Sequence, residues 1–178
     1  MANGRLYGVG VGPGDPELLT LKAERILKSV SVICMPQSET SSESFAYTIA
    51  QGFIDVNHQE IMRISFPTDD EEGASLAWQD AADEIAVRLR NGSDVAFITE
   101  GDPMLYSTFS YVLESLRDKH PDLEIEVVPG VSSVMAAAAS AKVPLVTHGQ
   151  RLAILPAVYG IDDLREAIAN YDTIVLMK

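Results

Sequence analysis

Short apolar stretches alternate with amphipathic stretches along the whole chain, and this alternation limits the possible folds more than any other feature. Residues 5–11 and 30–35 are apolar, and each is followed by a turn and then by residues with helical spacing. The pattern continues with apolar stretches at residues 60–66, 94–99, 125–128, 152–155 and 173–177. Strands that alternate with helices predict βαβ units. We therefore expect an α/β protein with a mostly parallel, open sheet.

A polar segment divides this pattern in two. Residues 117–122, RDKHPD, contain a proline and no apolar aliphatic side chain. We predict an N-terminal α/β domain over residues 1–119 and a second α/β domain over residues 120–178. The chain stops directly after its last predicted strand, and a sheet seldom ends on an uncovered buried strand. We therefore expect the second domain to be truncated.

The charge balance excludes several classes of partner. The 178 residues include 13 Lys and Arg against 26 Asp and Glu, a net charge of −13. Nucleic acids and anionic membranes bind basic surfaces, so we expect neither as a partner.

The single cysteine, Cys34, excludes an intrachain disulfide and a cysteine-built zinc site, and we expect no bound metal. No stretch resembles a leader or reaches the ~20 apolar residues of a membrane span, which favours a cytoplasmic protein.

Four glycines lie between residues 8 and 14, after the first predicted strand. They do not form a dinucleotide fingerprint, because G-x-G-x-x-G counted from Gly10 needs a glycine where Asp15 stands. No Lys-Ser or Lys-Thr pair follows them, so they are not a phosphate-binding P-loop either. A tight turn from strand to helix is the simplest interpretation.

Two later loops have similar chemistry. Asp102-Pro103 follows an apolar strand as Asp15-Pro16 does, and each pair suits a capping Asp with Pro at the first helical position. Ser132-Ser133 opens a third predicted helix. A plain helix cap would explain each aspartate. However, the carboxyl ends of parallel strands meet at one edge of a sheet, where ligands bind. We therefore expect the three loops to form one pocket.

Three ordered motifs resemble those of the tetrapyrrole methylase family: GVGVGPGDPELLTLKA (8–23), VAFITEGDPMLYSTFSY (95–111) and VVPGVSSVMAAAA (127–139). The resemblance covers nearly the whole chain. It implies a class III methyltransferase that is dependent on S-adenosylmethionine, has a non-Rossmann fold and forms a homodimer.

Two stretches, EGDPMLYSTF and RLAILPA (151–157), are similar to family members that methylate carbon C20 of precorrin-2 or cobalt-factor II in cobalamin biosynthesis. Two alternatives stay open. One is a sibling methylase for another precorrin, for uroporphyrinogen III or for a diphthine-type substrate. The other is a fragment that binds cofactor without turnover.

The resemblance also implies a set of cofactor-binding residues. Carried over position by position, they are Pro13, Glu100, Gly101, Asp102, Leu105, Ser132, Ser133 and Met177. In this reading the backbone at Pro13 and Gly101 approaches the ligand, and Asp102 accepts a hydrogen bond from a ribose hydroxyl or the ammonium group. The two serine hydroxyls suit the methionyl carboxylate. No catalytic Ser-His-Asp arrangement is visible, and the base that removes the C20 proton is unknown.

Other residues have open roles. Tyr106 and Ser107 follow the second motif's turn and either contact a ligand or, for Tyr106, pack under the next helix. A substrate with many carboxylates needs a local basic patch in so acidic a protein. The candidates are Arg63, Lys142, His148 and Arg151, for which ordinary surface charge is the alternative.

Overall fold

The computed structural model describes residues 2–38, 43–67, 71–156 and 160–177. Contacts divide the chain into two compact units, Met1–Ser132 and Ser133–Lys178. Among the described residues, no helix is both long and apolar enough to cross a membrane.

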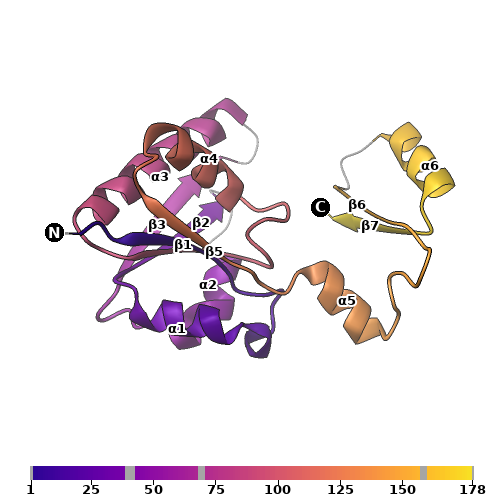
Figure 1. Cartoon of the computed structure of the whole chain (residues 1–178), viewed down its shortest axis with the longest axis horizontal. Helices are drawn as coiled ribbons and strands as arrows, with labels where there is room; N and C mark the ends of the chain where they lie inside the picture. Colours follow the sequence, from indigo (N-terminus) through magenta and orange to yellow (C-terminus); the bar gives the residue numbers. More distant parts are fainter. Residues whose placement is uncertain (1, 39–42, 68–70, 157–159, 178) are drawn as a thin grey trace. The chain divides into compact units, whose positions relative to one another are not determined.

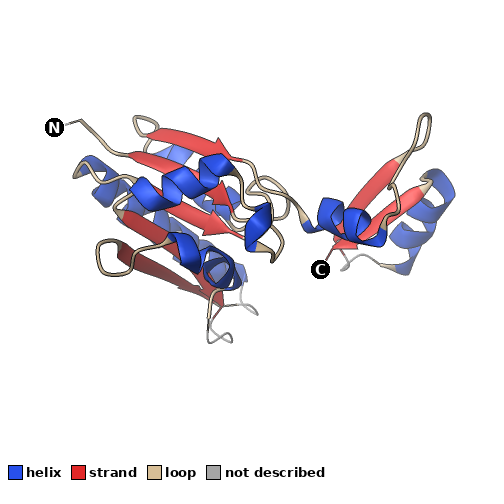
Figure 2. Ribbon diagram, turned by 90° about the horizontal axis from the view of Figure 1, so that it is seen from below, coloured by secondary structure: helices blue, strands red, loops and turns tan. Residues whose placement is uncertain are grey.

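The first unit contains a five-stranded sheet in which every strand runs in the same direction (Figure 2). Its strands are β1 (Arg5–Gly10), β2 (Val32–Ser38), β3 (Glu60–Phe66), β4 (Val95–Thr99) and β5 (Glu124–Val128). They lie in the order β3-β2-β4-β1-β5, so β1 has β4 on one side and β5 on the other. The predicted α/β fold with a mostly parallel sheet is confirmed.

Helices cover both faces of this sheet (Figure 1). The 3-10 helices η1 (Pro16–Leu18) and η2 (Gln51–Phe53) accompany α1 (Leu21–Ser29) and α2 (Phe45–Ala50) on one face, and α3 (Glu71–Arg90) and α4 (Phe109–Lys119) lie on the other. Side chains alternate between the two resulting cores: Phe97 of β4 packs with α3 and α4, whereas Ile98 packs with α1 and α2. Because both faces are buried, β4 has a continuous run of apolar residues rather than an alternating pattern.

The second unit contains α5 (Ser133–Ala141), β6 (Leu152–Pro156), α6 (Ile161–Asn170) and β7 (Thr173–Met177). Its two strands pair in parallel, with Leu152 opposite Thr173 and Pro156 opposite Met177. The Thr173 hydroxyl donates to the carbonyl oxygen of Leu145, which ties the loop before β6 to β7.

The boundary between the units differs from the one that the sequence predicts. β5 pairs with β1 from Arg5 opposite Glu124 onward, and Arg5 Nε donates to Glu124 Oε2 at 3.0 Å. β5 therefore belongs to the first unit, and the polar segment 117–122 is a connection within one sheet. A polar loop that contains proline is typical both of linkers and of such connections, so composition alone did not separate the two.

A hydrogen-bond network joins α3 to the end of α4. Arg90 Nη2 lies 3.1 Å from His120 Nδ1, and His120 Nε2 lies 2.9 Å from Asp83 Oδ1. Because a guanidinium only donates, His120 Nδ1 accepts and Nε2 carries the proton that is donated to Asp83. This hydrogen bond from His120 lowers the pKa of the Asp83 carboxyl.

We predict that Asp83→Asn lowers the thermal midpoint at pH 7. A carboxyl whose pKa is lowered on folding stabilises the folded state above its unfolded pKa of 3.8 and loses that effect as the pH falls further. The difference in midpoint between the native and variant chains should therefore shrink below pH 3.8. Thermal unfolding followed by circular dichroism from pH 7 to pH 3 measures it.

Asp80→Asn is the matched control, because the Asp80 side chain makes no ion pair or hydrogen bond within the described part of the chain. An Asp83→Asn difference that stays constant across this pH range would contradict the proposed role of the carboxylate.

Candidate functional site

The loops that follow β1, β4 and β5 meet at the carboxyl edge of the first sheet. We call them the β1 loop (residues 11–15), the β4 loop (residues 100–108) and the β5 loop (residues 129–132). Gly101 N donates to the carbonyl oxygen of Gly12 at 2.8 Å, and Val11 N donates to that of Thr99 at 2.9 Å. The predicted convergence of the three loops is therefore found, and it follows from the position of β1 between β4 and β5.

Glycine at three positions lets the three backbones approach so closely. A Cβ added to Gly130 would lie 2.0 Å from the carbonyl oxygen of Gly101, and one added to Gly10 would lie 2.5 Å from the same oxygen. Gly101 itself has φ of 66°, in the left-handed region that glycine adopts without strain. Any side chain at Gly10 or Gly130 would push the loops apart.

Asp102 fastens two of these loops together. Its Oδ1 accepts from the backbone N–H of Met104, and its Oδ2 accepts from that of Gly130, both at 2.9 Å. Hydrogen bonds from N–H groups to a carboxylate are among the stronger ones in proteins. Because each carboxylate oxygen can accept more than one hydrogen bond, Asp102 keeps the capacity to bind a ligand donor.

Asp15 caps a helix with Pro16 at its first position, as the sequence predicts, but that helix is only the 3-10 helix η1, whereas Asp102-Pro103 forms a turn. Asp15 Oδ1 accepts from Glu17 N at 2.9 Å, as Asp102 Oδ1 does from Met104 N, so the local chemistry is the same. However, only the short η1 follows Asp15, and α1 begins after a second cap, in which Thr20 Oγ1 accepts from Ala23 N.

The other predicted cofactor residues of the first unit surround the junction. Pro13 follows Gly12 in the β1 loop, and the Ser132 Cα lies 3.8 Å from where a Cβ of Gly101 would stand. In the β4 loop, Glu100 is exposed and Leu105 is half-buried. The remaining two belong to the second unit: Ser133 opens α5, and Met177 is the last residue of β7.

Tyr106 and Ser107 have different environments. Ser107 is buried, its Oγ lies 2.9 Å from Thr99 Oγ1, and it accepts from Phe109 N at 3.1 Å. Ser107 therefore anchors the end of the β4 loop to the end of β4. Tyr106 is 55% exposed and does not pack under the helix, and its φ of 49° helps to delay the start of α4 to Phe109.

The candidate partners for substrate carboxylates are all exposed: Arg63 on the edge strand β3, and Lys142, His148 and Arg151 in the second unit. Within the described ranges none of these four side chains forms an ion pair with an acid, although the Arg151 guanidinium lies 5.8 Å from the Tyr171 ring centroid. Among the same residues, no group of three or more His, Cys, Asp or Glu is placed to hold a metal ion.

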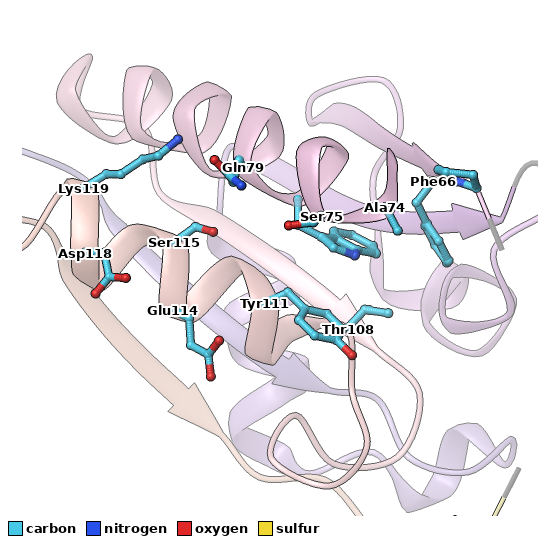
Figure 3. Close-up of a pocket in the computed structure, with 12 residues that line it drawn as sticks. Phe66, Ala74, Ser75, Gln79, Thr108, Tyr111, Glu114, Ser115, Asp118 and Lys119 are labelled. Carbon is cyan, nitrogen blue, oxygen red and sulfur yellow. The ribbon is translucent and has the colours of Figure 1, made fainter. Parts of the chain in front are cut away.

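A hollow of about 800 Å³ lies between α3 and α4 (Figure 3). Phe66, Trp78 and Tyr111 provide its aromatic lining, and polar side chains such as Glu114 and Lys119 line the rest. The predicted cofactor residues are absent from the described residues that line it. We therefore place the candidate site at the loop junction, where the predicted residues of the first unit and the Asp102 carboxylate lie together.

We predict that Asp102→Asn lowers the free energy of unfolding by about 1–3 kcal/mol, because the amide can accept only one of the two hydrogen bonds and turns its NH₂ toward a backbone N–H. Asp15→Asn is the control. Only one oxygen of Asp15 accepts a backbone hydrogen bond, so asparagine preserves the turn and the stability should stay within about 0.5 kcal/mol of the native value. Denaturant titration of both variants tests this, and equal losses would contradict the bridging role of Asp102.

Comparison with known proteins identifies the family. The model of the family "Tetrapyrrole (Corrin/Porphyrin) Methylases" matches residues 5–178. A probable cobalt-precorrin-2 C(20)-methyltransferase of Methanocaldococcus jannaschii is 42% identical over 98% of this chain and 72% of its own length. The cobalt-precorrin-2 C(20)-methyltransferase of Salmonella typhimurium is 34% identical over 99% of this chain and 73% of its own length.

A solved structure is also similar. The uroporphyrin-III C-methyl transferase of Thermus thermophilus, complexed with S-adenyl homocysteine, aligns with a TM-score of 0.57 and 26% identity over 88% of this chain and 57% of that one. The sequence motifs, the parallel sheet and its three converging loops agree with these matches. The chain belongs to the tetrapyrrole (corrin/porphyrin) methylase family.

Proposed function

We propose that this protein transfers a methyl group from S-adenosylmethionine to carbon C20 of precorrin-2 or of its cobalt form, in cobalamin biosynthesis. Two relatives that carry this activity in their names are 42% and 34% identical to the chain. The observation that carries the proposal is the junction of three loops through Gly10, Gly101 and Gly130. This junction lies at the carboxyl edge of the sheet, where α/β proteins bind ligands.

The residues around the junction fit a bent sulfonium nucleoside. At Gly101 the nearest atom to a Cβ position is the Ser132 Cα at 3.8 Å, so ligand atoms can approach the backbone there. Asp102 can accept from a ribose hydroxyl or an ammonium group. Ser132 adds a hydroxyl to the β5 loop beside Gly101. The resemblance to the family motif is our ground for assigning Ser133 and the first N–H groups of α5 to the methionyl carboxylate. Pro13, Glu100, Leu105 and Met177 complete the proposed set.

The proposed reaction needs alignment more than acid–base groups. The cofactor supplies an electrophilic methyl on sulfur, and C20 of the reduced macrocycle is an enamine-like carbon. As the new C–C bond forms, the C–S bond breaks, its electron pair stays on sulfur as a thioether, and C20 later loses a proton. Holding two reactants in line and excluding water contributes roughly 7–11 kcal/mol. A rigid junction suits that task.

We also propose that the protein is a cytoplasmic homodimer. The single cysteine, Cys34, is buried and unpaired with any other cysteine, as suits a reducing compartment. Burial also raises the pKa of its thiol, which keeps it unreactive. Sedimentation equilibrium of the purified chain tests the dimer.

The decisive experiment supplies S-adenosylmethionine with a ¹³C-labelled methyl group, together with anaerobic precorrin-2 or its cobalt form, and locates the label by NMR. We expect one new methyl at C20. Label at another carbon, or only on uroporphyrinogen III or diphthine precursors, would favour a sibling activity. Binding of S-adenosylhomocysteine without any transfer would favour a cofactor-binding fragment.

We predict that Gly101→Ala weakens S-adenosylhomocysteine binding about tenfold or more, because the added methyl strains a left-handed backbone and protrudes between the β4 loop and Ser132. Gly149→Ala is the matched control, because Gly149 has a similar φ of 83° in a turn outside the proposed cofactor set. Isothermal titration calorimetry measures both. Equal effects at the two glycines would show that the loss is not specific to the junction.

A further inference from the structure

We infer that Tyr106 is a substrate-contact residue whose ring packs against the apolar face of the tetrapyrrole macrocycle. This inference rests on the proposed function and deepens it, because it assigns a side chain to the substrate rather than to the cofactor.

The backbone of Tyr106 is the first observation. Its φ of 49° lies in the left-handed region, where a Cβ crowds the following carbonyl oxygen. A glycine would adopt this conformation without that strain, and bulky residues adopt it rarely. Strained residues of this kind concentrate at sites where ligands are bound.

The loop on both sides of Tyr106 is pinned. Toward the amino end, both carboxylate oxygens of Asp102 accept backbone hydrogen bonds, one of them from Gly130. Toward the carboxyl end, buried Ser107 bonds to the Thr99 hydroxyl and to Phe109 N. These contacts fix the ends of the short segment between them and so compensate for the strained conformation.

The strained backbone conformation does not bury the Tyr106 side chain. It is 55% exposed, and Met104, two residues earlier, is 59% exposed, whereas Leu105 between them is half-buried. Tyr106 and Met104 therefore expose part of an aromatic residue and part of a thioether residue beside the junction. Exposed apolar side chains held rigidly at a ligand-binding edge are typical of a binding surface.

The chemistry of this pair suits the substrate. A tetrapyrrole presents a broad apolar ring system, which an aromatic face and a polarizable thioether can cover. The cofactor, by contrast, is proposed to lie against the backbone junction and Leu105. We therefore assign Tyr106 to the tetrapyrrole macrocycle.

The test compares five variants in the full chain: Tyr106→Phe, Tyr106→Ala, Tyr106→Gly, Tyr111→Ala and Tyr111→Gly. Tyr111 is also 55% exposed but lies on α4, where it lines the hollow in Figure 3. We expect Tyr106→Ala and Tyr106→Gly each to raise the KM for precorrin-2 about tenfold, since both remove the ring. Tyr106→Phe should retain a KM close to the native one, as should Tyr111→Ala.

Two further measurements do not depend on turnover. Anaerobic equilibrium binding of precorrin-2 without cofactor should weaken about tenfold in Tyr106→Ala and Tyr106→Gly, while the dissociation constant of S-adenosylhomocysteine stays within about twofold. In addition, the thermal midpoint of Tyr106→Gly should be higher than that of Tyr106→Ala, because only glycine relieves the strain of the left-handed backbone conformation. At Tyr111 the order should reverse, since an α-helix favours alanine over glycine.

Native KM values in both ring-deleted variants would overturn the inference. It would also be overturned if the affinity for S-adenosylhomocysteine fell instead, because the ring would then contact the cofactor. A native chain that transfers no methyl to precorrin-2 would contradict the proposed function itself, and that result appears before any variant is made.

Discussion

The close approach of three backbones at Gly10, Gly101 and Gly130 is the constraint on which the candidate site depends. Neighbouring strands in a sheet lie about 4.8 Å apart, so loops leaving β4, β1 and β5 begin side by side. They stay together only because no Cβ stands between them. The junction is therefore built mainly from backbone, whose position is fixed by the sheet. Asp102 then locks two of the loops with a pair of hydrogen bonds.

The two Asp-Pro turns show how topology gives different roles to the same local chemistry. Asp15 and Asp102 each accept from the N–H two residues later, at the same distance. Asp15 is exposed, and its role is the local one of capping η1. Asp102 faces the β5 loop, so its second oxygen reaches Gly130. A residue that is locally a turn former thus becomes a link between strands distant in the sequence.

The sequence alone predicted the features that local chemistry decides. It did not predict the features that depend on pairing between residues far apart in the chain. Apolar runs such as residues 94–99 predicted the strands, and strand–helix alternation predicted their parallel direction. The convergence of the loops followed from that direction. The position of β5 did not, because its pairing with β1 joins residues as far apart as Arg5 and Glu124. The role of Gly130 was missed for the same reason, although a Pro-Gly pair directly after a strand was a usable signal.

The acidity of the chain becomes compatible with an anionic substrate when charge is considered locally. Many of the basic groups are already neutralised by acids, as Lys22 is by Glu126 and Arg88 by Glu60. At physiological salt the Debye length is about 8 Å, so exposed carboxylates on distant helices contribute little at the loop junction. The groups nearest the junction include hydroxyls, the exposed ring of Tyr106 and the carboxylates of Glu100 and Asp102, and Asp102 already accepts two backbone hydrogen bonds. The hydroxyls and the ring carry no charge, and they are buried at low cost when each hydroxyl finds a hydrogen-bond partner. Under the proposed function, shape and neutral donors would select the macrocycle at this site, while the net charge of −13 belongs mainly to the wider surface.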